Sequence, residues 1–162
     1  MPESIALDAA ADKPSRYREL MPQLRSLVEG EPDLIANLAN ITAALREILP
    51  IASWVGFYVR RGDELVLGPF QGKIACVRIA FGRGVCGTAA AEKRTVIVPD
   101  VEKFPGHIAC DAGSRSEIVV PIVRSGEVVA VLDLDSYAVA AFDDVDAEWL
   151  ERVAELASTF AW

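Results

Sequence analysis

The chain has 162 residues, of which 52% are hydrophobic, and a formal net charge of −8 from 24 acidic and 16 basic residues. This length suits one domain that buries roughly 70% of its unfolded surface, and the composition excludes intrinsic disorder. The negative charge disfavours nucleic acid and anionic membrane surfaces as partners.

The N-terminal part of the chain predicts a tail and two helices. Residues 1–15 are irregular and are expected to form a flexible tail, so that residues 16–162 make a single domain. Leucines at helical spacing predict a helix over residues 16–29, which Pro22 should distort. A second helix is predicted over residues 33–49, where Pro50 ends it.

The middle of the chain changes to a strand period. Strands are predicted at residues 54–60, 64–68, 76–79 and 95–99, and a glycine-rich turn at 81–87 leads into a short helix at 88–92. That turn lacks the spacing of a phosphate-binding loop. An antiparallel hairpin follows at 118–123 and 128–135.

The last predicted element is an amphipathic helix over residues 143–159, with Val145, Trp149, Val153 and Leu156 on its inner face. Helices at both ends of a set of hairpin-connected strands indicate an α+β domain. We therefore expect a central antiparallel sheet of about six strands, flanked by N- and C-terminal helices.

No apolar run approaches the roughly 20 residues that cross a bilayer, and the polar N-terminus lacks the layout of a signal peptide. The expected location is therefore cytoplasmic. With one histidine and no C-x-x-C pair, the sequence predicts neither a metal site nor a cofactor.

The three cysteines, Cys76, Cys86 and Cys110, all fall in or beside irregular segments. A single cysteine is more often a small buried hydrophobe, but three at loop edges favour a thiol-redox site in which one thiolate attacks and another resolves. Cys86 lies just before the predicted short helix, whose dipole should lower the pKa of its thiol. Local electrostatics therefore favour Cys86 as the more acidic thiol.

Two further groups of side chains could serve a ligand. Asp133 and Asp135 project from one face of a strand, and Glu117 begins the neighbouring strand, so the three carboxylates should converge and raise at least one pKa. They would hold a cationic ligand or act as a general acid, unless they form only a solvated strand end. Trp54 and Tyr58 share one strand face and form either core or the wall of an apolar cage.

Four segments carry a specific resemblance to a known family. They are G-P-F-Q-G-K-x-A-C-V-R-I at 68–79, G-R-G-V-C-G-T-A-A-A at 82–91, V-P-D-V-x-x-F-P-G-H-I-A-C-D at 98–111 and S-R-S-E-I-V-V-P at 114–121. In this order they resemble the free methionine-(R)-sulfoxide reductases, which are stand-alone GAF domains. The departures, at residues 79–80 and 111–114, replace no proposed catalytic group.

The resemblance implies reduction of free L-methionine (R)-sulfoxide, with thioredoxin as the reductant. It makes Cys110 the nucleophile and Cys76 the resolving cysteine, with Cys86 auxiliary, against the electrostatic preference for Cys86. Glu117 and Asp135 would be catalytic, and the substrate would contact the residues Trp54, Tyr58, Ile108, Ala109, Glu117, Asp133 and Asp135. A homodimer through the terminal helices is compatible with the family.

A non-catalytic GAF sensor with redox-sensitive cysteines is the alternative to the enzyme. Such sensors normally carry a fused output domain, for which this chain has no room. A plain interaction module would leave the three cysteines unexplained.

Overall fold

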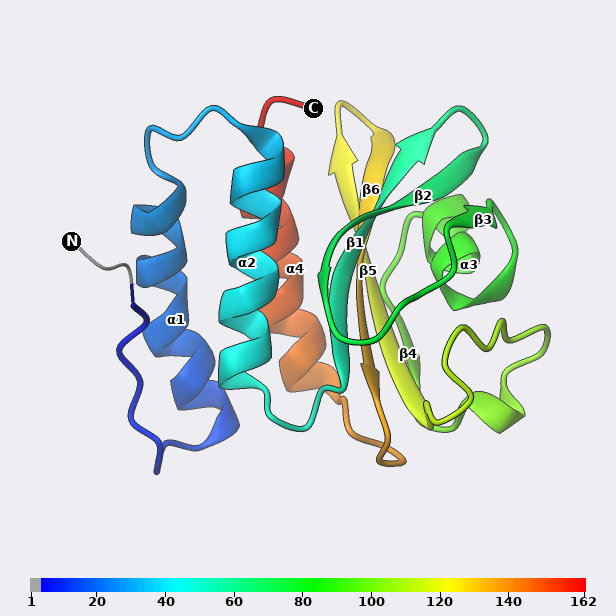
Figure 1. Cartoon of the computed structure of the whole chain (residues 1–162), viewed down its shortest axis with the longest axis horizontal. Coiled ribbons are helices and arrows are strands. Elements are labelled where there is room, and N and C mark those ends of the chain that lie inside the picture. Colours follow the sequence, from blue (N-terminus) through cyan, green and yellow to red (C-terminus); the bar gives the residue numbers. More distant parts are fainter. Residues whose placement is uncertain (1–3) are drawn as a thin grey trace.

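Six antiparallel strands form one sheet in the computed structural model, which describes residues 4–162 (Figure 1). The strands are β1 (Trp54–Arg61), β2 (Glu64–Gln71), β3 (Arg78–Ala80), β4 (Val96–Val98), β5 (Ser116–Arg124) and β6 (Glu127–Ser136). Their order across the sheet is β3-β2-β1-β6-β5-β4, so that β1 and β6 lie at the centre. The predicted α+β architecture is confirmed.

The helices are unequally divided between the two faces of this sheet. They are α1 (Lys13–Val28), α2 (Leu34–Ile48), α3 (Gly84–Glu92) and α4 (Asp144–Ser158), and a 3-10 turn spans Val101–Lys103. Figure 1 shows α2 and α4 between the sheet and the outer helix α1, whereas α3 covers the opposite face. No helix in residues 4–162 is both long and apolar enough to cross a bilayer.

Alternation along the central strands separates the two faces. In β1, Val55 and Phe57 point into the apolar core beneath the three helices, while Trp54 and Tyr58 belong to a second cluster under α3. In β6 the same alternation places Leu134 on the helix side and Asp133 and Asp135 on the α3 side. The strand period therefore places both aspartates of β6 on the α3 face.

The N-terminal segment differs from its prediction. The first helix begins at Lys13, three residues before the predicted position 16, because Asp12 caps it by accepting a hydrogen bond from Ser15 N. It continues through Pro22. Within residues 4–12, Ala6 N donates to Gln23 Oε1 at 2.8 Å, so this part of the predicted tail lies along α1. Residues 1–3 lie outside the described range, and the division into a tail and one domain stays a prediction.

Two later elements are also corrected. Cys76 lies in the loop before β3 rather than in a strand. On α4, only Val153 of the four predicted inner residues is fully buried, together with Leu150, Ala154 and Ala157. The other three predicted residues, Val145, Trp149 and Leu156, are partly buried and pack against the same core. Trp149 stacks on Tyr17 of α1 with ring centroids 6.1 Å apart.

Candidate active site

A cavity opens on the α3 side of the sheet, at the end where β5 and β6 carry their acidic residues. Its floor is the strand surface, one wall is the first turn of α3, and its rim is formed by the loops at residues 72–77 and 104–114. Eight of the ten predicted site residues line it: Trp54, Tyr58, Cys86, Ile108, Cys110, Glu117, Asp133 and Asp135. The predicted Ala109 is exposed and does not line the cavity.

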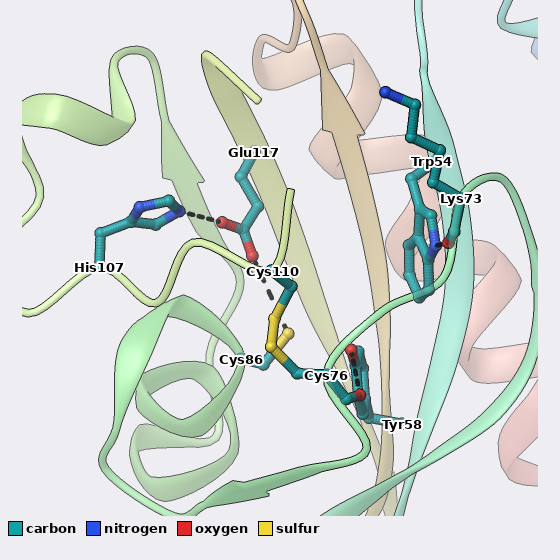
Figure 2. The surroundings of a disulfide bond; sticks show 8 residues. All are labelled: Trp54, Tyr58, Lys73, Cys76, Cys86, His107, Cys110 and Glu117. Carbon is teal, nitrogen blue, oxygen red and sulfur yellow. Dashed lines mark hydrogen bonds and ion pairs between the residues drawn. A yellow bond between two sulfur atoms is a disulfide. The ribbon is translucent and has the colours of Figure 1, made fainter. Parts of the chain in front are cut away.

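A disulfide joins Cys76 and Cys110 at the rim, with their Cα atoms 5.3 Å apart (Figure 2). Thirty-four residues separate the two in sequence, and the antiparallel sheet brings their loops together. The pairing agrees with the nucleophile and resolving cysteine that the family resemblance implies.

The third cysteine, Cys86, is a free thiol in the first turn of α3 and is buried beneath the disulfide. Burial raises the pKa of this thiol well above its ordinary value, and the nearby Asp133 and Glu117 carboxylates raise it further. The predicted low pKa is therefore wrong. The helix dipole is outweighed by desolvation and by acidic groups that come from strands far along the chain.

Glu117, Asp133 and Asp135 converge as predicted from the strand register. Glu117 lies directly opposite Asp135 across the β5–β6 pair, and Asp133 follows on the same face. Burial raises the pKa of all three carboxyls well above their usual range, and their mutual repulsion adds to the effect. The predicted rise in pKa is confirmed. These raised pKa values favour the protonated form of each carboxyl more than in an exposed Asp or Glu.

One oxygen of this cluster lacks a partner. Asp133 is only 5% exposed, and its Oδ1 accepts no hydrogen bond from the residues that the structure describes. A buried acceptor without a donor costs about 1–3 kcal/mol. Such an atom at the floor of a cavity indicates a place for a ligand's donor group.

The sequence analysis assigned no role to His107, the only histidine. Its Nε2 lies 3.6 Å from Glu117 Oε2, and its side chain is mostly buried at the cavity wall. Burial lowers the pKa of the imidazole, so His107 is neutral at neutral pH. Its place in the loop beside Cys110 was the only signal in the sequence, and the contact with Glu117 comes from the fold.

Trp54 and Tyr58 line the cavity and also hydrogen-bond the loop that carries Cys76. Trp54 Nε1 donates to Lys73 O at 3.0 Å, and Tyr58 OH donates to Cys76 O at 3.0 Å (Figure 2). Their rings stack with centroids 5.9 Å apart, and Gly56 between them leaves room because any side chain there would overlap the Trp54 ring. The loop that carries Cys76 is thus fixed to the floor of the cavity.

The chain matches the model of the GAF domain over residues 32–160. It is 54% identical over 145 residues to GAF domain-containing protein A of Dictyostelium discoideum, covering 89% of this chain and 91% of the relative. It is 48% identical over 151 residues to the free methionine-R-sulfoxide reductase of Escherichia coli (strain K12), covering 93% and 92% of the two chains.

A solved structure is equally similar. The free methionine-R-sulfoxide reductase of Neisseria meningitidis, in complex with its substrate, superposes with a TM-score of 0.91 at 51% identity and covers 96% of this chain and 94% of its own. The chain therefore belongs to the family of GAF domains that includes the free methionine-R-sulfoxide reductases.

Proposed function

We propose that the protein reduces free L-methionine (R)-sulfoxide to L-methionine, with Cys110 as the nucleophile and Cys76 as the resolving cysteine. The Cys76–Cys110 disulfide at the rim of a cavity with buried carboxyls is the observation that carries this proposal. The relatives that bear the name of this activity, and the substrate complex among them, support it.

The reaction begins from the reduced enzyme. The Cys110 thiolate attacks the sulfoxide sulfur while the sulfoxide oxygen takes up a proton. The oxygen passes to Cys110, which becomes a sulfenic acid as methionine leaves with its sulfur reduced by two electrons. The Cys76 thiol then attacks the sulfenic sulfur, and the disulfide forms as water departs.

The proton comes from the acidic cluster. Glu117 and Asp135 face each other across β5 and β6 with raised pKa values, so they hold protons at a pH where ordinary carboxylates are ionised. Neutral His107 beside Glu117 adds no positive charge that would lower that pKa. A protonated carboxyl in a buried site is a suitable general acid for an oxygen that gains negative charge.

Asp133 and the loop before Cys110 would hold the two ends of the amino acid. The unbonded Asp133 Oδ1 would accept a hydrogen bond from the substrate ammonium, with Asp135 beside it. Within residues 4–162, the backbone N–H groups of Ile108 and Ala109 donate to no protein acceptor, so they are available to the substrate carboxylate. Ala109 thus contributes through its backbone.

This arrangement explains a preference for the free amino acid. In a peptide, a methionine sulfoxide residue has an amide in place of the ammonium, and it would leave Asp133 without a cationic partner. The stacked rings of Trp54 and Tyr58 would form the apolar wall for the thioether carbons. Cys86, whose raised pKa keeps it a thiol, would have an auxiliary role.

Thioredoxin would reduce the disulfide after each cycle, and we expect the protein in the cytoplasm, where such a reductant is maintained. A homodimer stays a prediction. No cofactor takes part in the proposed steps.

The test is NADPH consumption, coupled through thioredoxin reductase and thioredoxin, with the separated R and S sulfoxide epimers of free methionine. We expect turnover of the R epimer only. C110S should lose even a single turnover, whereas C76S should form one equivalent of methionine and then stall. A methionine burst in C110S would show that another group is the nucleophile, and turnover of neither epimer would favour a non-catalytic sensor.

A further inference from the structure

Exposed apolar side chains surround the disulfide. Ile74 and Val77 flank Cys76 with exposed fractions of 90% and 62%, and Ile108, two residues before Cys110, is 38% exposed. We call these three residues the apolar rim. Exposed apolar side chains that gather around one feature mark a contact surface more often than scattered single ones do.

The loop that presents Ile74 is held in place. Trp54 Nε1 bonds the carbonyl of Lys73, on one side of Ile74, and Tyr58 OH bonds the carbonyl of Cys76, on the other (Figure 2). Both donors are buried ring systems of β1. Ile74 therefore projects from a fixed segment, and its exposure is a property of the fold.

A polar cluster links the two sides of the rim. Lys73 Nζ lies 3.8 Å from Asp111 Oδ2 and 5.3 Å from the centre of the Tyr137 ring, and Tyr137 OH donates to Asp111 at 2.7 Å. The loop of Cys76 is thus joined to the loop of Cys110 beside the disulfide as well as through it.

We propose that the apolar rim is the docking surface for a dithiol protein reductant. This inference rests on the proposed function, because only a catalytic disulfide must be reduced in every cycle. The disulfide at the centre of this surface indicates which kind of protein would bind there. A reductant's thiolate must reach a disulfide sulfur, and a protein that brings its thiolate there has to cover the side chains on either side. A small thiol has no such need.

The reductant reduces the Cys76–Cys110 disulfide in two thiol–disulfide exchange steps. One reductant thiolate bonds to a sulfur of the Cys76–Cys110 disulfide, and the other sulfur leaves as a thiolate. The second reductant thiolate then attacks the mixed disulfide and releases the remaining cysteine. The enzyme gains two electrons and, on protonation, two protons, while the reductant becomes a disulfide.

The test compares two reductants on variants of the rim. I74S and V77S each remove an apolar side chain that is exposed in the free protein, so the melting temperature should not change. Rates are measured with limiting reduced thioredoxin and, separately, with dithiothreitol. We expect each variant to lose about fivefold or more in the kcat/KM for thioredoxin, the scale of a residue that contributes to an interface. The rate with dithiothreitol should stay at that of the wild type.

The matched control is I35S, since Ile35 is 60% exposed on α2, on the opposite side of the sheet. Equal losses with thioredoxin in I35S and I74S, or no loss in I74S and V77S, would overturn the proposal. A loss with both reductants would also overturn it, because it would mean that the loop positions Cys76 rather than binding a partner. A change in oligomeric state without a change in kcat/KM would assign the rim to a second copy. If the wild type forms no methionine with dithiothreitol, the proposed function itself is contradicted, independently of the docking surface.

Discussion

Asp146 of α4 and Asp133 of β6 are both buried carboxyl groups, 0% and 5% exposed, but only the first is fully hydrogen-bonded. Asp146 Oδ1 accepts from Tyr17 OH at 2.7 Å, and its Oδ2 accepts from Lys13 Nζ at 2.7 Å and from Asp143 N at 2.9 Å. Asp133, on the opposite side of the sheet, has one oxygen without any partner in the described chain.

The two buried carboxyl groups therefore differ in what they do: Asp146 stabilises the fold, whereas Asp133 is available to a ligand. On the helix side, a buried carboxylate caps α4 and connects it to α1, so every bond it makes stabilises the fold. On the α3 side, Asp133 forms no ion pair within residues 4–162 and has an unbonded oxygen, which costs stability and leaves it available to a ligand. Four predictions test this contrast, from the largest expected effect to the smallest.

Asp146→Ala should remove about 3 kcal/mol from the free energy of unfolding, because it leaves the buried Tyr17 hydroxyl without its acceptor and removes one of the two ion-pair partners of Lys13. Urea unfolding measures this loss. Asp144→Ala is the matched control, since Asp144 is exposed in the same helical turn. The kcat/KM of the folded Asp146→Ala protein should equal that of the wild type; a large fall would mean that this side of the sheet also serves the reaction.

Asp133→Asn should lower activity without lowering stability, which is the opposite of the effect expected for Asp146→Ala. Loss of the carboxylate that we propose as the acceptor for the substrate ammonium should lower kcat/KM for free methionine sulfoxide by a factor that corresponds to about 2 kcal/mol. The free energy of unfolding should not fall, because a neutral amide is easier to bury than a charge. Steady-state kinetics and urea unfolding on one preparation give both numbers. Unchanged kinetics would remove Asp133 from the substrate site.

The dependence of stability on pH should also distinguish the wild type from Asp133→Asn. The folded-state pKa values of Glu117, Asp133 and Asp135 are raised, so these groups bind more protons in the folded state than in the unfolded state. Their stabilising contribution is complete below the unfolded pKa of about 4 and is lost as the pH rises through the folded values.

Wild-type stability relative to Asp133→Asn should therefore fall as the pH rises above about 4. Melting temperatures of both proteins across this range measure the difference. His107, whose pKa is lowered, acts in the opposite direction but is common to both proteins. A difference that rises with pH would contradict the assignment.

Tyr58→Phe should have the smallest effect. It removes the hydroxyl that holds the Cys76 carbonyl while leaving the ring in place, so disulfide formation should slow about fivefold, as for the loss of one bond worth about 1 kcal/mol. The first equivalent of methionine should form at the wild-type rate. Rapid quenching followed by a count of free thiols separates the two steps.

Tyr17→Phe is the control, because it also removes a buried hydroxyl, on the helix side. It should lower stability without slowing disulfide formation. Equal slowing in both variants would mean that Tyr58 acts through general stability only.

Some predictions from the sequence failed where distant parts of the chain meet. The prediction of a low pKa for Cys86 used only its neighbours along the chain, whereas burial, together with Asp133 of β6 and Glu117 of β5, raises that pKa. His107 gained its contact with Glu117 only through the fold.

The sequence by itself determined the architecture and the chemical groups of the site. A period of two in β1, β5 and β6 fixes which residues share a face, and the hairpin register places Glu117 opposite Asp135, because these are local properties of the chain. The tertiary structure alone decided that Cys86 keeps its proton, that Asp133 has a free oxygen, and that Trp54 and Tyr58 fix the loop of Cys76. Burial and hydrogen bonding depend on groups that are distant in the chain, which no local pattern records.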